Sequence, residues 1–485
     1  MHGAARGECG GACTSRNCAC ILRAHILPVK TSTLPFLGVF AAISLAAVAE
    51  QTIEVRGKHE KEFSKRQVRT LADLPAVPAD AGLDEFGGLP GAGVKAAGFF
   101  RTQKIGERWW LVDPKGGLFV SKGVVSVAPG KTKGAKAEIE HQFGDTSGWA
   151  EQTTATLRNN GFNSLGSWSE NEPLRAVPHP VVQTKLWSFM SSYGKKRGGT
   201  HMEAGHTGYT NDAIFVFDPD FAKFCDEHAK QLEATKNDSW LLGHYSDNEL
   251  PLKRTILKGF LTLPENEPGY RAAWEWFRKR HGALAKVEQI SEQDQKDFLA
   301  FVADRYFSIV SRAIRKHDPN HLFLGARFHS AVYDFPELFK ASGPYVDVVS
   351  VNYYFAWTPE PAKMAMWTAQ SGKPVIITEW YAKGEDSGMG NTGGAGWLVH
   401  TQKDRGLYYQ HFALGLLAQP TCVGWHWFRY ADNDPDDKAV DPSNRDSNKG
   451  IVTFRYKPWT ELLEAMKPLN DRAYGLIRHF DQHKP

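Results

Sequence analysis

The chain has 485 residues, of which 42% are hydrophobic and 23% charged, with 45 Gly and 26 Pro. These values are ordinary for globular proteins and exclude a disordered or fibrous chain. The net charge of +4 is small for this length, and no run of Lys and Arg stands out. A nucleic-acid partner therefore has no electrostatic basis in the sequence.

The N-terminus resembles a targeting segment. Residues 34–48 are apolar, Lys30 supplies a positive flank, and Ala47-Val48-Ala49 offers a cleavage site between small residues. We therefore expect residues 1–49 to be a signal peptide and the mature protein to be secreted or periplasmic. No later apolar run is long enough to span a bilayer, so no membrane contact is expected after signal removal.

The cysteines divide between this leader and the mature chain. We expect Cys225 and Cys422 to be two buried free thiols, with a single disulfide between them as the alternative. The other four cysteines would be removed with the leader: Cys9, Cys13, Cys18 and Cys20.

Residues 50–96 are polar and then rich in Pro and Gly, which predicts an irregular lead-in. From there, short apolar or aromatic runs alternate with stretches of helical period, which is typical of βα units. The first expected strand is the second arm of a hairpin, 109–112 with 118–127. The others are 162–168, 185–190, 241–246, 321–327, 346–353, 374–380 and 421–428. Helices are expected at 150–159, 221–234, 294–316, 405–417 and 458–466.

Eight such strands in one series predict an α/β fold, a (β/α)8 TIM barrel over residues 97–485, with an open doubly wound sheet as the alternative. Long segments follow strands one, four, seven and eight, at 127–148, 250–293, 381–404 and 429–457. Strand-to-helix loops build the active-site face of a barrel, so we expect the substrate cleft at that rim.

Two glutamates lie at the ends of expected strands. Glu249 follows the fourth strand and Glu379 ends the seventh. A retaining glycoside hydrolase needs two carboxyl groups about 5–5.5 Å apart, one as acid/base and one as nucleophile. Glu249 alone could be a helix N-terminal carboxylate and Glu379 alone an ion-pair partner, but the matching positions of the two favour catalysis.

The flanking runs resemble a known family. Asn-Glu after strand four and Glu after strand seven are similar to clan A of the glycoside hydrolases. Three fuller runs resemble glycoside hydrolase family 50, the β-agarases: LLGHYSDNELP (241–251), VIITEWYAKGEDSGM (375–389) and VGWHWFRYADND (423–434). FNSLGSWSE (162–170), ARFHS (326–330) and SVNYY (350–354) fit the same pattern, so the resemblance covers roughly 97–470.

This resemblance implies a retaining β-glycosidase that cuts a galactan such as agar, or a related β-galactoside, without a cofactor or metal. Glu249 would be the acid/base, Glu379 the nucleophile, and Asn248 a donor to the sugar 2-hydroxyl. Tyr353 or Tyr354 would hold Glu379. The remaining expected substrate contacts are the aromatic residues Trp168, Trp380, Trp425 and Trp427, and the polar residues Arg327, His329 and Asn352.

Several alternatives stay open. Trp425 and Trp427 face the same way along their strand, so either could be core, and His329 could simply cap a loop. The acidic run around Asp432 lacks the spacing of a calcium loop, so a solvated or substrate-facing loop is expected. A transglycosylase would use the same residues, and a non-catalytic carbohydrate-binding barrel would keep only the aromatic ones. The oligomeric state is not encoded in any motif.

Overall fold

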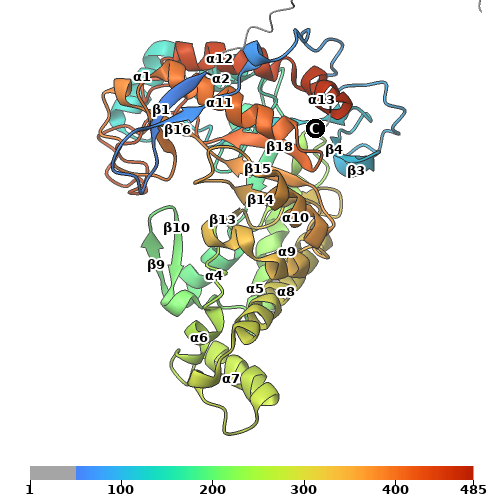
Figure 1. The fold of residues 1–485 in the computed structure, drawn as a ribbon, viewed down its shortest axis with the longest axis vertical. Coiled ribbons are helices and arrows are strands. Elements are labelled where there is room, and N and C mark those ends of the chain that lie inside the picture. The colour runs from blue at the N-terminus through green and yellow to red at the C-terminus, as the bar shows by residue number, and fades with distance from the viewer. Residues whose placement is uncertain (1–50, 484–485) are drawn as a thin grey trace, which may run out of the picture. The chain divides into compact units, whose positions relative to one another are not determined.

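Parallel strands form the centre of the described part of the chain, residues 51–483 of a computed structural model. One sheet has the order β13 (Phe328–His329), β14 (Val349–Asn352), β15 (Val375–Glu379), β18 (Cys422–Trp427), β6 (Ser121–Val124), β7 (Ser164–Leu165). A second has the order β12 (Leu322–Phe323), β11 (Leu241–Tyr245), β8 (Gln183–Leu186). With helices between the strands, the predicted α/β class is confirmed (Figure 1).

The two sheets are linked at both ends. On one side, Leu165 of β7 donates its backbone N–H to Val182 O at 2.7 Å, directly before β8. On the other side, β12 and β13 belong to one chain segment, in which β12 pairs with β11 and β13 with β14. Between them, Ser246 N donates to Gly325 O at 2.9 Å. The order of strands in space therefore follows their order along the chain.

Helices cover the outer side of these strands. In Figure 1, α8 (Glu292–His317), α9 (Pro336–Ser342) and α10 (Pro361–Ser371) lie along β13 and β14. The longest described helix, α8, begins at a capping box in which Ser291 and Asp294 satisfy each other's backbone N–H groups. Further helices between strands are α2 (Thr146–Asn159), α3 (Asn171–Arg175), α4 (Phe189–Arg197), α5 (Phe221–Ala229) and α11 (Gln402–Leu417), while α12 (Thr460–Asn470) and α13 (Ala473–Gln482) follow β18.

The sheet is buried on both sides, as near-continuous apolar strands require. One cluster of buried side chains comes from successive strands and includes Leu242, Leu324, Val348, Ile376 and Val423. A second, larger cluster lies between the strands and the helices. An antiparallel sheet of β3 (Arg101–Ile105), β4 (Arg108–Val112) and β5 (Leu118–Phe119) leads into β6, as the predicted hairpin requires.

Each predicted strand range overlaps an observed strand, although their ends differ. The range 185–190 is the clearest case, because β8 stops at Leu186 and Phe189 already begins α4. The expected irregular lead-in is wrong at its start: β1 (Thr52–Arg56) and β2 (Ser64–Gln67) form a hairpin, and β1 also pairs with β17 (Trp397–Val399). Because β17 pairs in turn with β16 (Ala382–Gly384), this sheet supports the connection after β15.

The connections between the central strands contain elements of their own. They hold α1 (Lys133–Phe143), the hairpin of β9 (Thr200–Glu203) and β10 (His206–Tyr209), and the pair α6 (Ile256–Leu261) and α7 (Pro268–His281). Figure 1 shows the hairpin apart from the central strands, near α4. Across residues 51–483, none of the helices combines the length and apolarity needed to cross a bilayer.

Cys225 and Cys422 are both buried and unbonded, which confirms the prediction of two free thiols. The predicted signal peptide and the four cysteines of the leader lie outside the described residues.

Candidate active site

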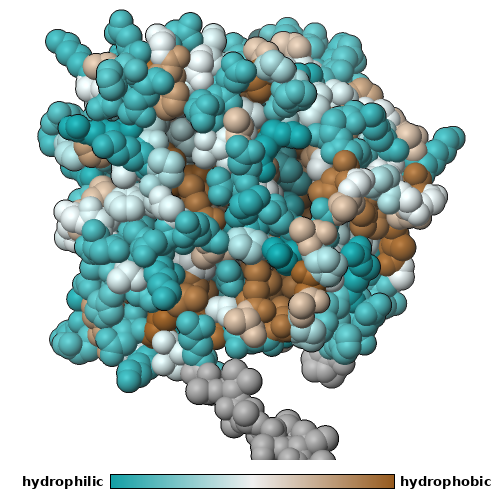
Figure 2. Space-filling view, turned by 90° about the horizontal axis from the view of Figure 1, so that it is seen from above, coloured by the Kyte–Doolittle hydropathy of each residue, from teal (hydrophilic) through white to brown (hydrophobic). Residues whose placement is uncertain are grey.

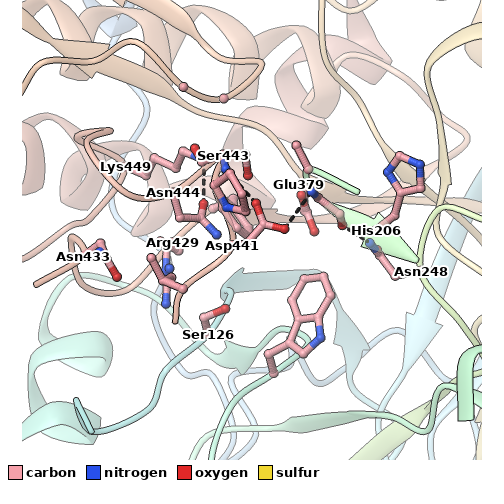
Figure 3. Close-up of a pocket in the computed structure, with 18 of the residues that line it drawn as sticks. Ser126, His206, Asn248, Glu379, Arg429, Asn433, Asp441, Ser443, Asn444 and Lys449 are labelled. Atoms are coloured by element: carbon pink, nitrogen blue, oxygen red, sulfur yellow. Dashed lines mark hydrogen bonds between the residues drawn. The ribbon is translucent and has the colours of Figure 1, made fainter. Parts of the chain in front are cut away.

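A cavity of about 1200 Å³ lies at the carboxyl ends of the parallel strands. Its lining comes mainly from the connections that follow β6, β7, β8, β11, β13, β14, β15 and β18. The cavity therefore lies at the rim predicted from loop length. In Figure 2, the hydrophobic side chains of the visible face gather in recesses between hydrophilic ones. Figure 3 shows that polar and charged residues dominate the labelled part of the cavity wall.

Glu249 lies four residues beyond the end of β11, in a left-handed backbone conformation with φ of 52°. Its side chain is 7% exposed. Asn352 at the end of β14 donates Nδ2–H to its Oε1 at 2.7 Å. Burial above all, and then the negative charge of Glu379, raise the pKa of the Glu249 carboxyl from 4.5 to about 8. The group therefore holds its proton at neutral pH, as a general acid must.

Glu379 is the last residue of β15 and has a different environment. Arg327 donates to its Oε1 at 2.6 Å, and the Tyr354 hydroxyl donates to its Oε2 at 2.6 Å. Each oxygen of Glu379 thus accepts a hydrogen bond, one from a guanidinium and one from a phenol, and the two donors fix the orientation of the carboxyl group. Of the two tyrosines considered for this contact, the structure therefore places Tyr354 on Glu379.

Arg327 connects the two sides of the site. Its guanidinium is fully buried and donates to Asn248 Oδ1 at 2.6 Å as well as to Glu379. Asn248 Oδ1 also accepts from Asn352 Nδ2 at 3.2 Å. The amide group of Asn248 is thereby oriented with its oxygen toward the protein. These contacts hold Asn248, Arg327, Asn352 and both glutamates in one hydrogen-bonded group.

Trp168 and His329 also line the cavity. The Trp168 ring is 42% exposed, and the Arg327 guanidinium lies 4.4 Å from its centroid. An exposed ring in such a position can stack on the face of a sugar, as expected from the sequence. His329 ends β13, with Nε2 3.8 Å from Glu249 Oε2.

Four of the expected substrate contacts lie elsewhere. Tyr353 points away from the cavity and donates its hydroxyl to Glu360 at the start of α10. The three tryptophans Trp380, Trp425 and Trp427 are buried in the core against α11. The reason is strand alternation: Glu379 faces the cavity, so Trp380 faces the helices. His426 faces inward onto Ser121, so its neighbours Trp425 and Trp427 face outward.

Other cavity residues were not predicted from the sequence. Figure 3 shows Arg429, Asp441 and Lys449, from the connection after β18, together with His206 from the β9–β10 hairpin. Gly205 at the tip of this hairpin donates its N–H to Asp441 Oδ2 at 2.7 Å and accepts from Asn248 Nδ2 at 3.2 Å. Two distant connections thus meet beside the glutamates. Polar loop residues with no regular spacing gave no sequence signal for these contacts.

The acidic run after β18 is part of this wall. Asp434 and Asp437 line the cavity, as a substrate-facing loop predicts. Asp432 also has a structural role, since it accepts bonds from the backbone N–H groups of Lys449 and Gly450 and from the Trp459 indole.

A separate cluster has the donor types of a metal site. His244, Asp318 and His321 are buried, and their ligand atoms lie within 4.8 Å of one another. Each contact has a simpler explanation, because both imidazoles bond to Asp318 Oδ2, at 2.8 and 2.7 Å. The remaining ring nitrogens bond to the Trp187 indole and to Asp238 O. The cluster is a satisfied hydrogen-bond network within the core.

No family model matches the chain, but individual proteins do. It is 26% identical over 526 residues to β-agarase B of Vibrio sp. (strain JT0107), covering 88% of this chain and 53% of that protein. It is 26% identical over 374 residues to β-agarase A of the same strain, covering 67% of this chain and 36% of that protein. The chain therefore spans about half or less of the length of these curated relatives.

A solved structure described as BpGH50 has a TM-score of 0.79 and 28% identity, covering 89% of this chain and 96% of that one. A solved exo-β-agarase has a TM-score of 0.68 at 23% identity, covering 82% of this chain and 68% of that one, and supports the likeness of fold. The chain is therefore similar, in sequence and in fold, to the glycoside hydrolases of family 50, and the resemblance carried by its motifs is confirmed.

Proposed function

We propose that the chain is a retaining β-glycoside hydrolase that cleaves a galactan of the agar type, with Glu249 as acid/base and Glu379 as nucleophile. The observation that carries this proposal is the contrast between the two carboxyl groups in one cavity. Burial raises the pKa of Glu249 to about 8, while Glu379 accepts from Arg327 and Tyr354. Environments that separate two carboxyl groups in this way suit an acid and a nucleophile. The names of the relatives supply the substrate class.

In the first step, Glu379 attacks the anomeric carbon while the bond to the leaving oxygen breaks. The bonding electrons go to that oxygen, which takes the proton of Glu249. In the second step, Glu249 accepts a proton from water as the water oxygen displaces Glu379, and the configuration is retained. A transglycosylase differs only in that a sugar hydroxyl replaces the water.

We also propose that the strands close into the expected (β/α)8 barrel. The pairing of β7 with Val182, of β12 with β11 and of β13 with β14 supports a continuous ring. The proposed catalytic unit is residues 97–485. Its lead-in is 50–96, and a secretory signal at 1–49 would deliver the protein outside the cytoplasm.

The experiment is an assay of purified protein on a panel of polysaccharides, including agarose, with product sizes resolved by chromatography. We expect oligosaccharides from agarose with the native chain and none with Glu249→Gln or Glu379→Gln. Hydrolysis that survives both substitutions would overturn the proposed site. Cleavage of a different polysaccharide by the native chain alone would correct the substrate and leave the site standing.

A further inference from the structure

The two carboxylate oxygens of Glu249 have different surroundings. Oε1 accepts the Asn352 amide, whereas Oε2 has no donor at hydrogen-bond distance among the described residues. The carbonyl oxygen of a carboxylic acid is the better acceptor of its two oxygens, so the Asn352 contact favours a proton on Oε2. In the reaction proposed above, Oε2 must therefore face the oxygen of the departing sugar.

Two imidazoles lie on that side. His206 Nδ1 is 3.9 Å from Oε2 and His329 Nε2 is 3.8 Å from it. These distances exceed a direct hydrogen bond. An oxygen atom that bonds to Oε2 would therefore lie near either ring nitrogen. The two rings are tilted by 46° with their centroids 6.1 Å apart, and both side chains are partly exposed, 20% and 29%, at the cavity.

His206 has an unused hydrogen-bonding atom. Its Nδ1 is buried, and the described residues provide it with no hydrogen-bond partner. Buried polar atoms usually have a partner, because leaving one unsatisfied costs about 1–3 kcal/mol. The other nitrogen, Nε2, lies 3.3 Å from Glu203 Oε2 on the same hairpin.

The hairpin tip holds His206 in place. Both backbone polar groups of Gly205 are bonded, the N–H to Asp441 and the carbonyl to Asn248. Gly205 has a φ of +95° and a Cβ there would lie 3.6 Å from Glu249 Oε2, so the tip closely approaches the acid. The His206 imidazole therefore belongs to a part of the cavity wall that the hydrogen bonds of Gly205 hold in place. In the view of Figure 3, His206 and Asn248 lie on one side of Glu379, with Arg429 and Lys449 on the other.

We propose that His206 and His329 form the binding site for the departing sugar, by hydrogen bonding its hydroxyl groups beside Glu249 Oε2. The inference rests on the proposed function, which it deepens by assigning the leaving-group side of the cavity. Burial above all lowers the pKa of His329 to about 4, so its ring is neutral at neutral pH. A neutral imidazole nitrogen can accept a hydrogen bond from a sugar hydroxyl. The retained sugar then occupies the opposite side, toward Arg429 and Trp168.

The test compares two substrates that share the same retained sugar. One is an agarose oligosaccharide, which places a sugar in the leaving-group site. The other is its activated aryl glycoside, which has no departing sugar. His206→Ala and His329→Ala should each lower kcat/KM on the oligosaccharide about tenfold, the loss of one hydrogen bond of about 1.4 kcal/mol. On the aryl glycoside both variants should stay within about threefold of the native chain.

A second readout follows the fate of the glycosyl-enzyme. With the aryl glycoside as donor and a galactose oligosaccharide as acceptor, the ratio of transfer to hydrolysis should fall in both variants. His179→Ala provides a control histidine, since His179 is exposed and does not line the cavity. It should keep both activities.

The outcomes separate the two proposals. Equal losses of kcat/KM on both substrates would mean that the histidines position the glutamates. No loss on either substrate would mean that the histidines do not contact the substrate. Each of these results overturns the leaving-group site. His206→Asn, which keeps a side-chain donor, guards against a folding defect and should recover part of the oligosaccharide activity. A native chain that cleaves neither substrate would instead refute the proposed function.

Discussion

At the scale of single residues, the site is defined by what surrounds two carboxyl groups. Glu249 is buried beside a second carboxylate with one amide donor, and Glu379 has a guanidinium and a phenol on its two oxygens. Glu379 ends β15 and Glu249 follows β11 by four residues, so both lie after the strands from which the sequence predicts them. Their partners could be predicted only partly, because Arg327, Asn352 and Tyr354 come from other strands, whose facing directions depend on register.

The raised pKa of Glu249 predicts a limit to activity at alkaline pH. The acid is effective only while protonated, so kcat/KM on an oligosaccharide should fall as the pH rises through about 8. An activated aryl glycoside, which leaves without protonation, should lack this alkaline limb in the glycosylation step. A pH profile with the same limb for both substrates would assign it to another group.

The same shift predicts an effect on stability. The folded-state pKa of about 8 exceeds the usual 4.5, so the folded protein binds this proton more tightly than the unfolded chain. The contribution of Glu249 to the free energy of unfolding is therefore lost as the pH rises from 4.5 to about 8. Glu249→Gln removes the titration, so its melting temperature relative to the native chain should increase from about pH 5 to pH 9. Thermal melts across this range measure the difference, and a constant difference would contradict the assigned shift.

At the scale of elements, apolar periodicity located the central strands and five of the covering helices, α2, α5, α8, α11 and α12. It failed for α3, α4, α9, α10 and α13, and for the β9–β10 hairpin, whose residues THMEAGHTGY lack apolar alternation. The assignment of Trp380 illustrates a second limit. Its direction follows from that of Glu379 once strand alternation is applied, whereas the direction of Trp427 depends on the inward position of His426.

The role of Asp432 in the connection after β18 can be tested at the scale of this one loop. Asp432 is buried and accepts from Asn448, Lys449, Gly450 and Trp459, so it fixes the loop that carries Lys449 into the cavity. Asp432→Ala leaves several buried donors unsatisfied and should lower the free energy of unfolding by about 2–4 kcal/mol. Denaturant unfolding measures this loss.

Asp436 in the same loop is the matched control. It is exposed, so Asp436→Ala should change the free energy of unfolding by less than about 0.5 kcal/mol. Equal effects of the two substitutions would show that Asp432 does not anchor the loop.

At the scale of the whole molecule, the likeness to family 50 extends over most of the chain, with 89% covered in the BpGH50 comparison. The hairpin of β1 and β2 could not be predicted, because its partner β17 follows more than 300 residues later. Its strands are also largely polar on one side. Proximity of this kind is set by the fold and is not visible in local patterns.

The secretory interpretation predicts where the mature protein begins. Cleavage after Ala-Val-Ala should give an N-terminus near Glu50. N-terminal sequencing of protein recovered outside the cytoplasm measures it directly. The mature chain should then show two thiols, Cys225 and Cys422, titratable only after denaturation because both are buried. Recovery of secreted protein that still contains Cys9 to Cys20 would refute the predicted cleavage.

The most direct test of the account is the stereochemistry of azide rescue in two variants, read by NMR of the glycosyl azide formed from an activated aryl β-glycoside. Glu249→Ala still forms the glycosyl-enzyme through Glu379, and azide then displaces it, so the product should have retained configuration. Glu379→Ala lacks the nucleophile, so azide attacks the substrate directly and any product should be inverted. The opposite pair of configurations would exchange the roles of the two glutamates, and undiminished activity in both variants without azide would contradict the catalytic site itself.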